Sequence, residues 1–231
     1  MRPIDLNADL GEEVTDDAAL LTVVTSANVA CGYHAGSEAI MRAVCRDAAA
    51  RGVSVGAQVS YDDRPGFGRV ALDVPYATLR AQVADQVRTL AALAREAGTE
   101  VRYVKPHGAL YHRVLDDEEQ ARAVLDGSVV DGVGLPVLGM PGVLLRLAEE
   151  AGRATHREGF PDRGVLASGR LLPRDRPGAV LHDPAAIAAR AVELASDVRS
   201  VCVHGDHPGA VDTARAVRRA LEAGGLALVG L

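Results

Sequence analysis

The residue with the clearest chemical potential is Lys105, the only lysine among the 25 Lys and Arg side chains of the chain. An ammonium group is a compact charge on a flexible stem, and its pKa shifts readily on burial. Pro106 favours extended geometry in the residue before it, so a strand is predicted to end at Lys105. Alternate residues of a strand share a face, which places Tyr103, Lys105 and His107 together. We interpret this face as part of a catalytic site, and the alternative is a solvated charge at a strand end.

A second polar face lies near the N-terminus. Residues 4–10 alternate polar and apolar side chains, so Asp5, Asn7 and Asp9 share one face of a predicted strand. A central strand of an open parallel sheet is normally apolar on both faces. We therefore expect these groups to point into the mouth of a barrel rather than into the core of an open sheet.

Polar residues follow six of the predicted strands in pairs. In a (β/α) barrel the carboxyl ends of all strands meet at one face, where such enzymes build their sites. Six pairs at equivalent positions therefore indicate one shared site. The pairs are Asp9 and Glu12, Asn28 and His34, Gln58 and Asp62, Lys105 and His107, Glu158 and Asp162, and His204 and Asp206.

The elements that must position these groups alternate between strand and helix about seven times, which indicates parallel βα units. A doubly wound sheet is the alternative, but it explains the polar first strand less well, and no G-x-G-x-x-G follows a strand. Thr15 is the expected N-cap of the first helix. Strands are predicted over 4–10, 23–31, 53–60, 101–105, 136–140, 154–158 and 200–204, with a closing strand or tail over 226–231. Helices are predicted over 15–21, 37–52, 75–97, 118–125, 142–151, 183–196 and 209–223.

Composition restricts the class of protein. The 231 residues, of which 48% are hydrophobic, fit an aliphatic α/β enzyme with a sizeable core. The net charge of -6, without blocks of like charge, argues against nucleic acid or an anionic membrane as a partner. The chain shows no signal-peptide core and no apolar run long enough to span a membrane, so we expect a soluble, cytoplasmic protein. The cysteines, Cys31, Cys45 and Cys202, lack the C-x-x-C spacing of a thiolate zinc site.

Four long motifs stand out: DLNADLGE over 5–12, SANVACGYHAG over 26–36, VKPHGALY over 104–111 and CVHGD over 202–206. They resemble the LamB/YcsF family, and the resemblance runs nearly end to end. It implies an α/β fold with a single domain over 1–231, an irregular seven-stranded (β/α) barrel like that of glycoside hydrolases and polysaccharide deacetylases. It also implies the A component of a 5-oxoprolinase, which hydrolyses 5-oxo-L-proline to L-glutamate with ATP, accompanied by Mg²⁺, as co-substrate and with B and C subunits as partners.

The chemistry that the resemblance implies agrees with the residues. Opening a lactam requires an activated water, stabilisation of the carbonyl oxygen and a proton for the leaving nitrogen. Carboxylates and imidazoles supply acid and base catalysis, and a lysine stabilises a developing anion. We assign Asp9 and His107 to proton transfer and Lys105 to anion stabilisation. The residues expected to bind or position the substrate are Asp5, Asn7, Glu12, Asn28, His34, Tyr111, Asp162, Arg163, His204 and Asp206.

Two alternatives stay open. The first is a metal-dependent, deacetylase-like amide hydrolase in which Asp9 with His34, His107 or His204 binds zinc. Gln58 weakens it, because this position is usually histidine in the family and a primary amide is a poor zinc ligand, so we expect no tightly bound metal. The second is a non-catalytic subunit that only binds the substrate. No G-x-x-x-x-G-K-[ST] phosphate loop is present, so we expect a partner to contribute to nucleotide handling.

Overall fold

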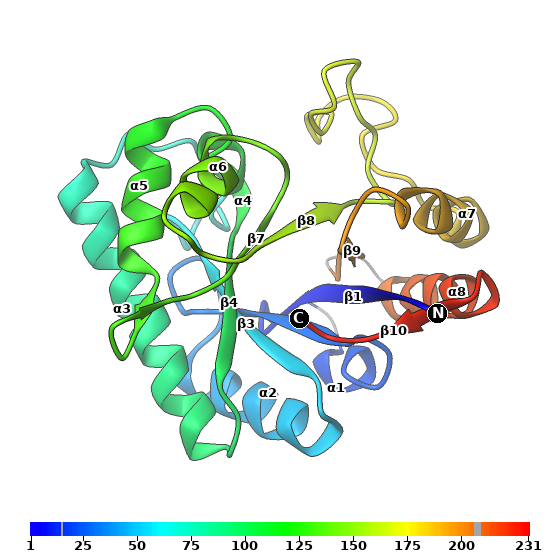
Figure 1. The fold of residues 1–231 in the computed structure, drawn as a ribbon, viewed down its shortest axis with the longest axis horizontal. Helices are drawn as coiled ribbons and strands as arrows, with labels where there is room; N and C mark the ends of the chain where they lie inside the picture. The colour runs from blue at the N-terminus through cyan, green and yellow to red at the C-terminus, as the bar shows by residue number, and fades with distance from the viewer. Residues whose placement is uncertain (15, 206–208) are drawn as a thin grey trace.

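Within residues 1–14, 16–205 and 209–231, which the computed structural model describes, seven parallel strands form a closed barrel (Figure 1). Neighbouring strands follow chain order, and the last of them, β9, pairs back with β1 to close the ring. The seven-stranded (β/α) barrel is therefore confirmed. The barrel strands are β1 Arg2–Leu10, β2 Ser26–Ala30, β3 Ser54–Val59, β4 Val101–Pro106, β7 Val137–Gly139, β8 Thr155–Gly159 and β9 Ser200–Cys202.

The other strands lie outside the ring. β10, Leu226–Leu228, pairs in parallel with the first residues of β1. The predicted terminal strand therefore exists, but β9 rather than β10 closes the barrel. β5, Val129–Val130, and β6, Val133–Gly134, form a small antiparallel hairpin.

Helices surround the barrel, as the outer ring of coiled ribbons in Figure 1 shows. The capping signals predict these helices well: Ser37 caps α2 and Asp183 caps α7 through side-chain oxygens that accept backbone N–H groups. The expected cap of α1 at Thr15 is wrong, because Asp16 accepts the Ala19 N–H and is the N-cap. Thr15 itself lies outside the described residues. The helices are α1 Asp17–Leu20, α2 Glu38–Arg51, α3 Tyr76–Glu96, α4 Gly108–Arg113, α5 Glu118–Gly127, α6 Val143–Glu150, α7 Pro184–Leu194 and α8 Ala210–Ala223.

The alternation within β1 separates the hydrophobic core from the barrel interior. Ile4, Leu6 and the other apolar residues of this strand belong to the main core cluster. The polar residues alternate with them and are also buried, so they face the inside of the ring. The strand thus places carboxylate and amide groups where the six polar pairs were expected to meet.

A long connection runs from β8 to α7 and extends away from the barrel, as the yellow excursion in Figure 1 shows. Arg163 fixes its base, because the guanidinium donates to the backbone carbonyls of Ala179 and Leu172 at 2.9 and 2.8 Å. Among the described residues, no helix is both long and apolar enough to cross a membrane.

Candidate active site

Lys105 lies inside the barrel mouth with only 3% of its surface exposed. Its Nζ lies 2.8 Å from Glu158 Oε1 and 3.1 Å from Asp9 Oδ1, and it donates to Asn7 Oδ1 at 3.4 Å. An isolated buried charge costs several kcal/mol, on the order of 3–5 when one partner of a pair is removed, so these contacts are what keep an ammonium here. The interpretation of Lys105 as a solvated surface charge is excluded.

The carboxylates beside Lys105 set its charge state. Burial by itself would lower the pKa of Lys105, but Asp9 and Glu158 outweigh burial and raise that pKa well above its usual value. Burial by itself would raise the pKa of Asp9, but Lys105 and then His107 outweigh it and lower that pKa. At neutral pH the pair is therefore an ammonium beside a carboxylate.

A layer of amides holds these charges in place. Asn7 Nδ2 donates to Glu158 Oε1 at 3.1 Å, and Asn28 Nδ2 donates to Asp9 Oδ1 at 2.9 Å and to Asn7 Oδ1 at 2.7 Å. Tyr103 donates its hydroxyl proton to Asn28 Oδ1 at 2.6 Å. Asn7 and Asn28, both fully buried, thus orient the carboxylates.

Asp5 lies deeper in the barrel, and it is not part of the cavity lining. Its carboxylate accepts hydrogen bonds from the hydroxyls of Thr25 and Ser26, each at 2.7 Å, and from the hydroxyl of Ser200. Burial raises the pKa of Asp5. Asp5 was predicted to bind substrate, but in the structure it holds neighbouring hydroxyl groups in place beneath the site.

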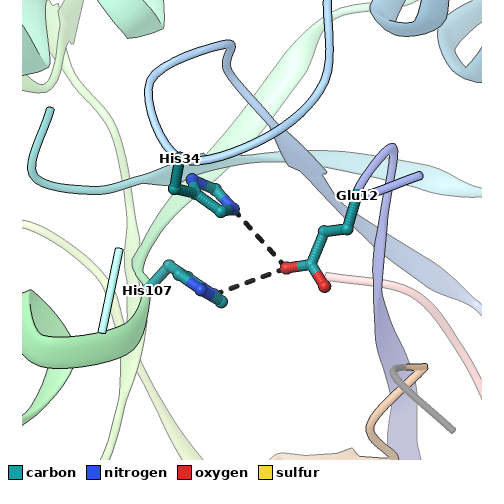
Figure 2. A group of neighbouring side chains, drawn as sticks. All are labelled: Glu12, His34 and His107. Carbon is teal, nitrogen blue, oxygen red and sulfur yellow. Dashed lines mark ion pairs between the residues drawn. The ribbon is translucent and has the colours of Figure 1, made fainter. Parts of the chain in front are cut away.

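Two stacked imidazoles form the other side of the site (Figure 2). The rings of His34 and His107 are 4.0 Å apart at 15°, and Glu12 Oε1 lies 3.5 Å from His34 Nε2 and 3.4 Å from His107 Nδ1. Gln58 Nε2 donates to the same Glu12 oxygen at 2.9 Å. Burial, and then the neighbouring His34 ring, lower the pKa of His107 well below its usual value. His107 is therefore a neutral imidazole at neutral pH.

A cavity of about 260 Å³ opens over these groups. Pockets for drug-sized ligands hold roughly 300–1,000 Å³, so this cavity suits a small metabolite. Most of the predicted site residues line it, and the others, apart from Asp206, lie beneath or beside it. Lining residues are Asp9, Glu12, Lys105, His107, Tyr111, Arg163 and His204. Asp5, Asn7, Asn28, His34 and Asp162 are buried next to them, and Asp206 lies outside the described residues.

The rim of the cavity is basic. Arg69, Arg163 and Arg174 contribute to its lining together with His112. Burial, followed by the charges of Arg163, Arg170 and Arg174, lowers the pKa of His112. A cavity with cationic walls in a chain of net charge -6 favours an anionic ligand.

The loop after β8 meets the segment after β9 through hydrogen bonds between Asp162 and His204. Asp162 Oδ2 accepts from the backbone N–H of His204 and lies 2.9 Å from His204 Nδ1. Burial by itself would raise the pKa of Asp162, but His204 outweighs it and lowers that pKa. Asp162 therefore positions His204 at the cavity wall.

Glu158 is the functional residue that sequence reasoning did not assign. The sequence placed it with Asp162 among the six polar pairs but gave it no role, whereas its two oxygens contact Lys105, Asn7 and Tyr111. Oε1 pairs with Lys105, and Oε2 accepts the hydroxyl proton of Tyr111 at 3.0 Å. The alternation of residues along β8 was the sequence feature that could have assigned it, because Glu158 is at a position whose side chain points into the barrel.

Comparisons with known proteins agree with this geometry. The LamB/YcsF family profile matches residues 4–231. The A component of 5-oxoprolinase from Streptomyces avermitilis is 55% identical, with 96% of this chain and 97% of that chain covered. The protein of the same name from Mycobacterium avium is 50% identical, with 98% of each chain covered. The lactam utilization protein from Thermus thermophilus is 35% identical and superposes over the full length of both chains with a TM-score of 0.92.

One more distant structure shows the shared fold alone. The catalytic domain of a peptidoglycan N-acetylglucosamine deacetylase from Eubacterium rectale has a TM-score of 0.56 and 11% identity. The match covers 100% of this chain and 88% of that chain. The barrel is therefore of the deacetylase type, as expected.

Proposed function

The chain belongs to the LamB/YcsF family, and from this we propose that it is the A component of a 5-oxoprolinase, which hydrolyses the lactam of 5-oxo-L-proline to L-glutamate. The names of relatives at 50 to 55% identity and the lactam utilization protein support the assignment. The observation that carries it is Lys105, a buried cation between Asp9 and Glu158 at the floor of a small cavity.

The cavity complements the proposed substrate in charge and size. 5-Oxo-L-proline is a five-membered lactam with one carboxylate, and the arginines of the rim provide cations for that carboxylate. Lys105 then faces the lactam carbonyl, where it stabilises negative charge that develops on the oxygen. This arrangement uses both ends of the substrate and leaves the reacting carbon beside Asp9 and His107.

The reaction needs one bond made and one broken at that carbon. A water oxygen bonds to the lactam carbonyl carbon, the carbon–nitrogen bond breaks, and the nitrogen takes a proton to become the amino group of glutamate. A carboxylate with a lowered pKa is a weak base while Lys105 pairs with it. As Lys105 turns to the substrate oxygen, Asp9 loses this partner and becomes the base for the attacking water, and His107 carries the proton to the nitrogen.

The proposal includes ATP, with Mg²⁺, as co-substrate and the B and C subunits as partners. An unstrained lactam resists water, and phosphoryl transfer from ATP to the lactam oxygen would release ADP and make the carbon more electrophilic. Attack by the first water and cleavage of the carbon–nitrogen bond would then leave a carboxyl phosphate, which a second water would hydrolyse to the carboxylate of glutamate and inorganic phosphate. The chain has no phosphate-loop motif, so a partner is expected to handle the nucleotide. The relatives are named as one component of a larger enzyme, which implies that other subunits accompany them. Because ATP is used, we place the reaction in the cytoplasm.

The test is a glutamate-release assay on the purified chain, alone and with the B and C subunits, each with and without ATP. We expect neither ATPase nor oxoprolinase activity from the isolated chain, and both activities from the three proteins together. Glutamate formed by the isolated chain with ATP would contradict the partner requirement. Glutamate formed without ATP would contradict the ATP-dependent reaction.

A further inference from the structure

The imidazole side of the cavity holds three potential metal ligands. One ligand atom from each of Glu12, His34 and His107 lies within 4.8 Å of the other two, and all three residues are buried (Figure 2). His34 Nε2 is a buried nitrogen without a hydrogen-bond partner in the described residues. We propose that these three residues bind one divalent transition-metal cation, of which Zn²⁺ is the best fit.

The tautomer of His34 follows from its other nitrogen. Ser60 Oγ donates its single proton to the backbone carbonyl of Tyr61 at 2.9 Å, so it can only accept from His34 Nδ1, which lies 2.9 Å away. Nδ1 of His34 therefore carries the proton. The lone pair lies on Nε2, which is 3.5 Å from Glu12 Oε1.

The same reasoning applies to His107. Its Nε2 lies 3.2 Å from the backbone carbonyl oxygen of Phe67, which can only accept, so Nε2 carries the proton. The lone pair on Nδ1 then faces Glu12 Oε1 at 3.4 Å. Each ring is held by an oxygen at one nitrogen while the other nitrogen points inward. Metal-binding histidines are oriented in this way.

The distances from the carboxylate oxygen to the two nitrogens suit a small tetrahedral ion, and the rings, stacked at 4.0 Å and 15°, must tilt for both lone pairs to point at it. Bonds of about 2.0–2.1 Å to zinc place tetrahedral ligand atoms about 3.3 Å apart. Glu12 Oε1 lies 3.4 and 3.5 Å from the two imidazole nitrogens. Without a cation, Gln58 Nε2 donates to Glu12 Oε1 and to His107 Nδ1, so the lone pair on His34 Nε2 is the one left without a donor among the described residues. Two imidazoles and a carboxylate suit Zn²⁺ and neighbouring transition metals.

Gln58 stands where a fourth ligand would be. Its Nε2 lies 2.9 Å from Glu12 Oε1 and 3.0 Å from His107 Nδ1, and its Oε1 is buried without a hydrogen-bond partner in the described residues. Turning the amide by 180° would exchange its nitrogen and oxygen and offer the oxygen as a fourth ligand to an ion held by the other three residues. The expectation that no metal is tightly bound rested on Gln58 alone and stays a prediction. The three other ligands favour the opposite result.

The site would act inside the cavity already described. Glu12 and His107 line that cavity, so a bound cation would face its contents and could polarise a carbonyl oxygen. The proposal does not rest on 5-oxoprolinase activity, because binding alone tests it and a negative activity assay leaves it standing.

The first experiment measures zinc binding by the chain without a polyhistidine tag. Chelator-treated protein is titrated with ZnCl₂ in a calorimeter, and bound metal is counted after dialysis. We expect about one equivalent in the wild type and affinity lower by about tenfold or more in His34→Ala and Glu12→Gln. His156→Ala is the control, because this histidine lies on β8 outside the cluster. It should bind like the wild type. Binding below about a tenth of an equivalent in the wild type, or undiminished binding in His34→Ala, would overturn the proposal.

A second experiment stays decisive if His34→Ala fails to fold. Gln58→His supplies imidazole in place of an amide, so zinc affinity should rise by about tenfold or more. A gain of affinity in a variant with the circular dichroism spectrum of the wild type supports the site, whereas no gain would contradict the place of Gln58 as the fourth ligand. Co²⁺ bound to the wild type should show visible bands of a nitrogen and oxygen site. An intense thiolate-to-cobalt band would move the ion to a cysteine and overturn the assignment.

Discussion

At the scale of single residues, the site depends on pairing buried charges. Lys105 touches two carboxylates, and amides or a phenol hold each carboxylate in turn. A buried charge that loses its partner is strongly destabilising. Substitutions that test function here must therefore keep shape and hydrogen bonding as far as possible.

Asp9→Asn is such a substitution. It is nearly isosteric and can keep the contact with Asn28, but it removes the negative charge beside Lys105 and the proposed base. In the assembled enzyme we expect glutamate release to fall by about a hundredfold or more. The melting temperature should change little, because Glu158 still pairs with Lys105. Unchanged turnover would favour a non-catalytic role for this chain, and failure to fold would indicate a structural carboxylate.

The sequence predicted side-chain roles where they follow from the alternation of residues along one strand. It did not predict roles that depend on contacts between strands distant in the sequence. The shared face of Tyr103, Lys105 and His107 follows from strand geometry alone. The role of Glu158 does not, because β8 is separated from β4 by β7, and only the closed ring brings its carboxylate to Lys105. The role of Gln58 could not be predicted either, because it depends on the contacts of its amide with Glu12 and His107.

At the scale of elements, β1 spans two levels of the barrel. Asp5 and Asp9 lie on the same face four residues apart, which is about 13 Å along a strand. Of these two residues, only Asp9 lines the cavity. Asp5 lies below it and accepts hydrogen bonds from three side-chain hydroxyl groups. The same strand therefore provides a residue for the reaction, Asp9, and a residue that stabilises the barrel beneath it, Asp5.

Asp5→Ala should therefore affect stability. The three hydroxyl donors lose a buried acceptor, so the free energy of unfolding should fall by about 1–3 kcal/mol in a denaturant titration. The Michaelis constant for 5-oxo-L-proline should stay close to that of the wild type. A large rise in that constant with unchanged stability would place Asp5 in direct contact with substrate.

The connection between the loops after β8 and β9 gives a pH-dependent prediction. Asp162 has a folded-state pKa below its unfolded value, so its pairing with His204 stabilises the fold above the unfolded pKa of about 3.9 and loses that effect as pH falls through the folded pKa. Asp162→Asn should lower the free energy of unfolding at pH 7. The difference from the wild type should shrink below about pH 3.9. A difference that stays constant from pH 7 to pH 3 would contradict the pairing.

The boundaries of elements were harder to predict than their existence. The second strand was expected over 23–31, but it spans Ser26–Ala30 because the N–H groups of Val23 and Val24 bond back to Leu20 at the end of α1. The short α4 was not predicted, because Pro106 and Gly108 in the sequence indicate a loop after the strand. In the structure Gly108 begins α4 with a φ of 60°.

At the scale of the whole molecule, barrel closure assembles the site. β9 pairs with β1, which brings Ser200 to Asp5 and Val203 to Asn7 across nearly the whole chain. Repeated polar strand ends and the polar face of the first strand favoured a barrel over a doubly wound sheet, and the family resemblance implied its seven strands. The closing strand was predicted less well, because the choice between 200–204 and the terminal segment depends on long-range pairing.

The most direct measurement is the turnover of Lys105→Arg in the complex with the B and C subunits and ATP. Arginine keeps the charge but replaces a compact ammonium with a planar fork, which does not fit between Asp9 and Glu158. The matched control is the reverse exchange, Arg102→Lys, on the exposed side of the same strand, and it should behave like the wild type. We predict that glutamate release falls by about tenfold or more in Lys105→Arg while the protein stays folded. Near-normal turnover in Lys105→Arg would contradict the claim that this barrel opens the lactam at Lys105.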